Sequence, residues 1–215
     1  IDRFNKLQNQ IEVQTPQISL HDWGEPTLHN KLPYFIKYAK EKNFKVGFSS
    51  NFNTLPDWEE IMKAKPDFIK VSISSLNEDK YKLTHRGGNL SRLLKNLKEV
   101  VKLRDKYSPL TDIQMNYHIY AHNLKEYDKV REFSKNNNLS WHGEIAIFMP
   151  IEKIVRFRKS LDAGELKING DDKKIISSLL ISPLSQYNHW KKNIKTRETF
   201  KDCSRQINKM AIRVD

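Results

Sequence analysis

Three side chains able to bind a metal or a polar ligand recur at intervals of four residues: His21, Glu25 and His29. On a helix this spacing would place them on one face, as a zinc site built from helical histidines requires. A helix is not expected here, because Pro26 fixes the backbone of a turn and Gly24 lets the chain approach a ligand closely. The turn instead presents the Glu25 carboxylate, which suits a cation such as an ammonium group. A divalent-metal site on the three side chains remains an alternative.

The elements that must position these residues alternate between strands and helices. Short strands are expected to begin near residues 17, 45, 68, 112 and 139. The gaps between them carry apolar residues at the three- and four-residue spacing typical of helices. This repeat predicts a parallel sheet with helices outside it. Helices are expected from Asn30, a possible N-cap, to Ala39, from Leu55 to Ala64, from Leu90 to Val101 and from Leu124 to Lys135.

The remaining segments are less regular. The first fifteen residues have the pattern of the end of a helix, closed by Pro16. Ser75–Asn89 is expected to be an irregular insert, and the regular alternation stops at Pro150. Beyond it we expect one helix, from Asp172 to Leu180, and a polar tail. We therefore divide the chain into an α/β barrel-like part over residues 1–150 and a C-terminal extension over 151–215.

Ligands of parallel α/β folds bind where the strands end and the loops leave. Four of the five expected strand ends are rich in small polar side chains rather than paired carboxylates, which favours binding of a polar ligand over acid–base hydrolysis. We expect structural roles for His118 and His122, with a substrate contact as the alternative. For Trp23 and Trp141 we expect core packing, with the wall of a pocket as the alternative. The polar residues at these ends include Ser49, Asn51 and Ser74.

Composition limits the classes of function. The net charge of +12 favours anionic ligands, but the basic residues are mostly scattered lysines rather than clustered arginines, so a nucleic-acid partner is not favoured. One cysteine cannot form a disulfide framework, nor can it supply a thiolate metal site alone. No signal peptide and no long apolar run is visible in these residues, which indicates a cytoplasmic protein without a membrane span.

The order of these pieces resembles the radical S-adenosylmethionine (radical SAM) superfamily. The run ISLHDWGEPTLHNKLPYFIKYAKEKNFKVGFSSNFN is similar to the family's strand, Gly-Gly-Glu-Pro turn, helix and second strand. The run DFIKVSISSLNEDKYKLTHRGGNLSRLLKNLKEVV is similar to its third strand, an insert with an arginine, and the next helix. The resemblance covers about residues 11–148.

The resemblance implies a partial parallel (β/α)6 barrel that binds S-adenosylmethionine and a [4Fe–4S] cluster and generates a 5′-deoxyadenosyl radical. By position, Gly24, Glu25 and Pro26 match the turn that holds the methionine amino group. The remaining matches are Ser49, Asn51, Ser72 and Ser74, which line the ribose and methionine region in relatives, Arg86, which matches an arginine near the methionine carboxylate, and Tyr117–Asn123 beside the adenine.

Two departures from the family pattern limit what this chain is expected to do. The three cysteines that hold the cluster in the family, spaced Cys-x3-Cys-x2-Cys, are not in this sequence, and the third strand ends in Ser-Ile-Ser-Ser without the usual aspartate. The run from Phe200 to Asp215 resembles the start of a SPASM-type extension, where Cys203 would be an auxiliary-cluster ligand in a longer parent.

We therefore expect a fragment of a radical SAM enzyme that is inactive alone. Its parent would modify a peptide, a carbohydrate or a small metabolite. A divalent-metal (β/α)-barrel enzyme without redox chemistry and a basic α/β module that binds RNA or another polyanion remain alternatives.

Overall fold

A computed structural model describes residues 16–21, 24–148, 151–164, 169–195 and 209–211 of the chain. The strands form one sheet in the order β5-β4-β3-β2-β1-β6. Each expected strand is found: β1 Gln17–Ser19, β2 Lys45–Ser50, β3 Phe68–Ile73, β4 Asp112–Ile119 and β5 Ser140–Ile145, with a short β6, Lys209–Ala211, in addition. The parallel α/β architecture predicted from the sequence is thereby confirmed.

The chain divides into two compact units. The first contains Ile1–Ser72, Ser91–Gln114 and Cys203–Asp215, and the second contains Ile73–Leu90 and Met115–Asp202. The division falls within β3 and β4, and each unit is described by itself.

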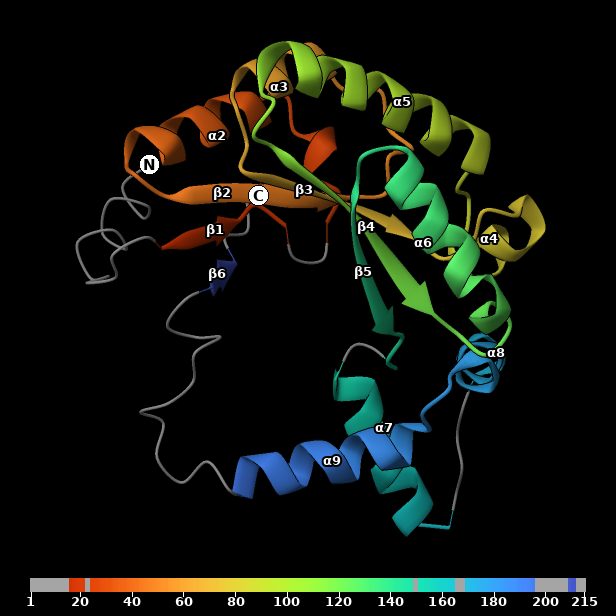
Figure 1. Cartoon of the computed structure of the whole chain (residues 1–215). Helices are drawn as coiled ribbons and strands as arrows, with labels where there is room; N and C mark the ends of the chain where they lie inside the picture. Colours follow the sequence, from red (N-terminus) through yellow and green to blue (C-terminus); the bar gives the residue numbers. More distant parts are fainter. Residues whose placement is uncertain (1–15, 22–23, 149–150, 165–168, 196–208, 212–215) are drawn as a thin grey trace. The chain divides into compact units, whose positions relative to one another are not determined.

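In the first unit, β1 pairs in parallel with both β2 and β6, and β2 pairs in parallel with β3. The helices α2 (Leu32–Glu41), α3 (Trp58–Lys63) and α5 (Leu90–Tyr107) lie along one side of these strands (Figure 1). The apolar periodicity explains this packing, since Ile36, Ile61 and Leu93 all lie on the buried faces of their helices.

Gly47 allows β2 and β3 to lie close together. A Cβ atom at this position would come within 2.1 Å of the Phe68 carbonyl oxygen, so no larger residue fits without moving a strand. The strand ends that could bind a ligand are therefore fixed by tight backbone packing.

The segment Ser75–Asn89 contains a helix, α4 (Glu78–Thr84), so the prediction of an irregular insert was wrong. Asn77 caps α4 by accepting a hydrogen bond from the Lys80 N–H, and Glu78 and Asp79 follow in the first turn. This start signal is present in the sequence. The predicted cap of α2 was also misplaced, since α2 begins after Lys31 rather than at Asn30.

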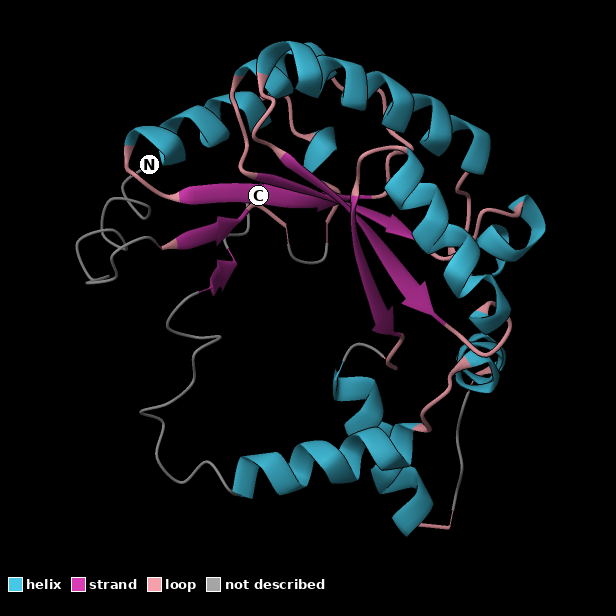
Figure 2. Ribbon diagram, viewed as in Figure 1, coloured by secondary structure: helices cyan, strands magenta, loops and turns pink. Residues whose placement is uncertain are grey.

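The second unit carries three helices beyond β5, where the sequence predicted one. They are α7 (Ile151–Asp162), α8 (Gly170–Ser178) and α9 (Pro183–Lys195), shown as cyan ribbons in Figure 2. Ile154, Phe157 and Leu161 have the spacing of a helical face in α7, and the many lysines and arginines around them obscured this signal. A short helix α6 (Tyr127–Asn136) precedes β5, as predicted.

In the described part of the chain, no helix has both the length and the apolar character needed to cross a membrane. The helix predicted within the first fifteen residues, Trp23 and the segment around Cys203 lie outside the described residues.

Candidate functional site

The Glu25 carboxylate joins the loops that follow β1 and β2. Its Oε1 atom accepts hydrogen bonds from the Thr27 N–H at 3.2 Å and the Thr27 hydroxyl at 2.5 Å. Its Oε2 atom accepts from the Asn51 N–H at 2.8 Å. A carboxylate has about four acceptor positions, so one position on Oε2 has no donor among the described residues.

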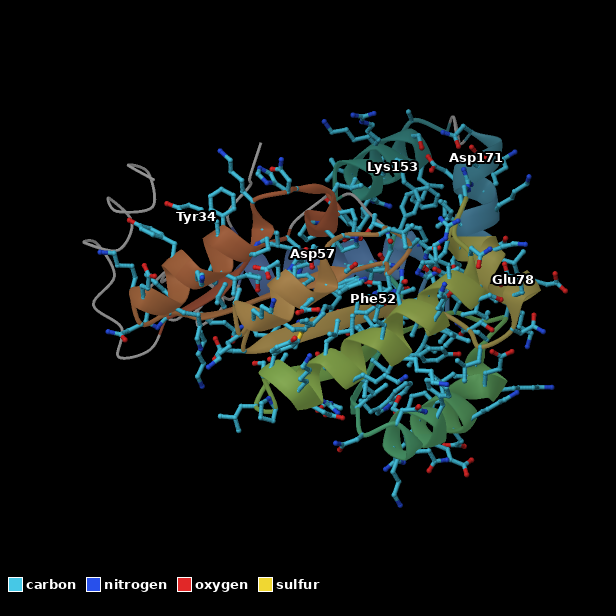
Figure 3. All side chains as sticks on the ribbon, turned by 90° about the horizontal axis from the view of Figure 1, so that it is seen from above. Tyr34, Phe52, Asp57, Glu78, Lys153 and Asp171 are labelled. Carbon is cyan, nitrogen blue, oxygen red and sulfur yellow. The ribbon has the colours of Figure 1, made fainter. Side chains whose placement is uncertain are left out.

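The loop after β2, Asn51–Leu55, is held from several sides. Its residue Phe52 has a left-handed backbone (φ 55°), which is uncommon for a bulky side chain, and its buried ring stacks on Trp58 at 4.8 Å. The Thr54 hydroxyl lies 2.5 Å from the Thr27 hydroxyl. Phe52 within this loop and Asp57 beyond its end are labelled in Figure 3.

Asn96 of α5 is the main anchor of this loop. Its side chain is 2% exposed and donates hydrogen bonds to the carbonyl oxygens of Phe52 at 2.8 Å and of Thr54 at 3.0 Å. The sequence analysis missed it. The available signal was a polar residue on the same helix face as the buried Leu93 and Val100.

Two predicted residues meet at the ends of β2 and β3. The Ser49 and Ser72 hydroxyl oxygens lie 3.0 Å apart. The Ser49 N–H donates to His21 Nδ1 at 3.0 Å, which ties the loop after β1 to the same place. The structure thus brings Ser49 and Ser72 together, and it joins Glu25 to Asn51.

The divalent-metal alternative finds no support in this geometry. His21 Nδ1 is engaged by Ser49, and His29 Nδ1 accepts from the Lys31 N–H at 3.1 Å. Among the described residues, no group of three or more histidine, cysteine, aspartate or glutamate side chains is placed to hold a metal ion.

Gly24 and Pro26 flank this site. A Cβ atom at Gly24 would meet nothing within 4 Å, so space remains beside the turn. Pro26 opens a short 3-10 helix, Pro26–Leu28, and Glu25 caps it by accepting from Thr27.

The other two predicted residues lie in the second unit. The buried Ser74 hydroxyl lies 2.6 Å from the Thr84 hydroxyl and 3.0 Å from His85 Nδ1. Arg86 Nη1 contacts Asp171 Oδ2 at 3.2 Å, and both side chains are exposed. Asp171 and Lys153 of the same unit are labelled in Figure 3.

The remaining aromatic and histidine predictions have separate outcomes. Trp141 packs against Tyr117 and Tyr127 with ring centroids 5.4 Å and 5.3 Å away, in agreement with the predicted packing role. His122 stacks on Tyr120 at 5.3 Å, and its buried Nε2 has no hydrogen-bond partner among the described residues.

The fold and the site together define an α/β protein whose parallel strands end in loops joined by one carboxylate. No protein family model matches the chain. Over 181 residues it is 28% identical to the GTP 3',8-cyclase of Alkaliphilus oremlandii, covering 83% of this chain and 49% of that protein. It is 27% identical over 119 residues to a Methanococcus maripaludis protein named "Probable GTP 3',8-cyclase", covering 54% of this chain and 38% of that protein.

Two solved structures are weakly similar. TYW1 with a lysine-pyruvate adduct bound gives a TM-score of 0.47 at 16% identity, covering 73% of this chain and 54% of that one. The protein anSMEcpe with bound AdoMet gives 0.47 at 13% identity, covering 75% of this chain and 51% of that one. Neither likeness is strong enough to carry an argument.

The chain is related to the radical SAM superfamily, to which GTP 3',8-cyclases belong. It spans about half the length, or less, of the curated relatives it matches.

Proposed function

We propose that this chain is the S-adenosylmethionine-binding part of a radical SAM enzyme. The observation that carries the proposal is the Glu25 carboxylate, which joins two strand-end loops and has one acceptor position on Oε2 to which no described residue donates. An ammonium group is a strong donor to such a position, because hydrogen bonds between charged groups are about twice as strong as neutral ones.

The side chains around Glu25 fit the rest of this cofactor. The Ser49 and Ser72 hydroxyls, 3.0 Å apart, can each donate to or accept from the hydroxyls of a ribose. Gly24 leaves room for a ligand against the backbone. The loop that begins at Asn51 is already ordered, which lowers the conformational entropy lost on ligand binding. Ser74 and Arg86 stay predictions, since their hydroxyl and guanidinium groups have protein partners in the second unit.

A [4Fe–4S] cluster does not fit this chain. Such clusters are held by several cysteine thiolates, and the chain has one cysteine. Radical chemistry is therefore proposed for a longer parent enzyme only, and no step of it is assigned to these residues.

We propose a small metabolite as the parent's substrate. The relatives' name, GTP 3',8-cyclase, supports this class over the peptide and carbohydrate alternatives. We also propose a cytoplasmic location, because a single cysteine is typical of proteins that carry no structural disulfides.

The test is binding of S-adenosylhomocysteine to the 215-residue chain, measured by isothermal titration calorimetry. We expect Glu25→Gln to weaken binding about tenfold to a hundredfold, the range for a hydrogen bond to a charged group. Glu41→Gln, on the exposed side of α2, is the control and should leave binding unchanged.

A further variant separates ligand contact from loop order. Thr54→Val removes the hydroxyl contact to Thr27 but keeps the Glu25 charge, so it should weaken binding less than Glu25→Gln. Equal losses in these two variants would assign Glu25 a purely structural role. Absence of binding to the unmodified chain would overturn the proposed function.

A further inference from the structure

The second unit contains a cluster of polar side chains around two histidines, His85 and His118. The ring of His85, which follows α4, stacks on Tyr81 at 4.3 Å with an angle of 7° between the planes. The ring of His118 on β4 lies 6.5 Å from that of His85, at 25°. Both histidines are half-buried. The cluster therefore presents polar atoms in a partly desolvated setting, where hydrogen bonds are strengthened.

The contacts around His85 are all satisfied together when one ring nitrogen, Nδ1, carries the proton. The Thr84 hydroxyl donates to the Tyr81 carbonyl oxygen at 3.4 Å, so in the 2.6 Å contact with Ser74 it accepts. Ser74 has then used its only proton, and its oxygen accepts from His85 Nδ1 at 3.0 Å. With the proton on Nδ1, these contacts are satisfied, and Nδ1 also lies 3.2 Å from the Thr84 hydroxyl oxygen, which can accept from it. His85 Nε2 is consequently a free acceptor.

The opposite tautomer follows for His118. Its Nε2 atom lies 3.2 Å from Asn116 Nδ2. An amide nitrogen can only donate, so Nε2 accepts and the proton of the neutral ring lies on Nδ1. His118 Nδ1 is consequently a donor.

Three atoms of the cluster have unused hydrogen-bonding capacity. His85 Nε2 is an acceptor, His118 Nδ1 is a donor, and Asn116 Oδ1 is an acceptor. Within the described residues, no protein group forms a hydrogen bond with any of them. Asn116 is 9% exposed, and the polar atoms of such buried residues are almost always paired with protein, water or ligand. This geometry provides both donor and acceptor positions for a ligand.

The cluster is uncharged near neutral pH. Burial, with a smaller contribution from His118, lowers the pKa of His85 to about 4. Burial also lowers the pKa of His118, although the negative charge of Glu144 opposes this shift. A phosphate or carboxylate ligand would call for arginine or lysine partners. A neutral cluster beside Glu144 suits an uncharged ligand instead.

We propose that His85, His118 and Asn116 bind the uncharged amide edge of the parent enzyme's substrate, a ring or carboxamide in which an N–H group stands beside a C=O group. The ligand N–H would donate to His85 Nε2 or Asn116 Oδ1, and the ligand carbonyl would accept from His118 Nδ1. This inference rests on the proposed function, and it names the substrate chemistry for that enzyme.

The test uses the full chain labelled with 15N-histidine, whose imidazole nitrogen signals are followed by NMR. Guanosine and nicotinamide are the two probes, one carrying the amide edge in a ring and the other in a free carboxamide. 1-Methylguanosine, which lacks the N–H group, is the matched control. We expect shifts at His85 Nε2 and His118 Nδ1 with at least one probe and none with 1-methylguanosine, and the active probe identifies the source of the edge.

Two pairs of variants separate ligand binding from structural support. When asparagine replaces a histidine, its amide nitrogen or oxygen lies near the former position of the ring atom Nδ1. When glutamine replaces the histidine, its amide nitrogen or oxygen lies near the former position of Nε2. His85→Gln keeps an acceptor near Nε2 and should retain probe binding, whereas His85→Asn keeps the Ser74 contact and should lose about threefold to tenfold in affinity. The order reverses at His118, where Asn keeps the donor and Gln loses it. His142→Gln, an exposed histidine of β5, is the control.

A purely structural role predicts the opposite order at His85, since the Asn variant preserves the contact to Ser74. That order, or equal shifts with inorganic phosphate, would overturn the inference. So would S-adenosylhomocysteine saturating both histidine signals, because the cluster would then belong to the cofactor. If the unmodified chain does not bind S-adenosylhomocysteine at all, the proposed function is overturned instead.

Discussion

The polar residues of the two candidate sites differ in how far the protein itself satisfies their hydrogen-bonding capacity. Glu25 has three of its acceptor positions filled by Thr27 and Asn51, and no other residue that the structure describes fills the fourth. His85 and His118 each use one ring nitrogen within the protein. Such partial satisfaction is typical of ligand sites, where side chains are fixed by some contacts and leave others to the ligand.

At the residue scale, the buried histidines predict a pH dependence of stability. The pKa of His85 is lowered from 6.5 to about 4 in the folded chain, so between these values the unfolded state binds more protons. Stability contributed by the neutral ring is thus complete above about pH 6.5 and is lost as the pH falls towards 4. We expect a loss on the order of 1–3 kcal/mol from this residue.

Urea unfolding at pH 7 and pH 5 measures this effect. Carboxylates also titrate in acid, so the informative quantity is the difference between the unmodified chain and His85→Asn, in which the titrating group is gone. The variant should lose less stability between the two values of pH. His142→Asn serves as the exposed control. Parallel pH slopes for the unmodified chain and His85→Asn would contradict the prediction.

At the scale of elements, α5 orders the loop after β2, Asn51–Leu55, through Asn96. Asn96→Leu leaves the carbonyl oxygens of Phe52 and Thr54 without their donor, and we expect it to cost about 2–4 kcal/mol of unfolding free energy, the sum of two buried hydrogen bonds. Hydrogen exchange should show the loss of protection concentrated in the amides of Asn51–Leu55.

Lys95→Leu, one residue earlier on the exposed face of α5, is the matched control for this experiment. If Asn96→Leu and Lys95→Leu have equal effects, or if protection is lost evenly over α5, then Asn96 does not anchor the loop.

The elements also show what sequence could predict. Apolar patterns located the strands, although of β2, β3 and β4 only β3 alternates strictly between buried and half-buried residues. They failed at α4, where capping by Asn77 rather than an apolar stripe starts the helix, and at α7, where basic residues surround Ile154. In the site, Glu25 was predicted from a turn motif. Asn96 and His85 were missed because their roles depend on contacts with residues distant in the sequence.

At the scale of the whole molecule, the site residues group by unit. Glu25, Asn51, Ser49 and Ser72 lie in the first unit, and the His85–His118 cluster lies in the second. The two groups differ in chemistry, one with a carboxylate and hydroxyls and the other with neutral imidazoles. Under the proposed function, the first unit would therefore bind the ammonium group of the cofactor, and the second unit would bind an uncharged substrate.

The cysteine content of the whole chain leads to a prediction about assembly of a [4Fe–4S] cluster. One cysteine cannot supply the thiolates of a [4Fe–4S] cluster, so anaerobic treatment with ferrous iron and sulfide should leave the chain without a stoichiometric cluster. Iron and sulfide analysis with visible absorption measures this, and Cys203→Ala should behave like the unmodified chain. Affinity for S-adenosylhomocysteine should be the same before and after treatment, because the described residues around Glu25 include no cysteine to hold a cluster. A stoichiometric cluster that disappears in Cys203→Ala would contradict the prediction and would show that one cysteine with non-thiolate ligands holds it.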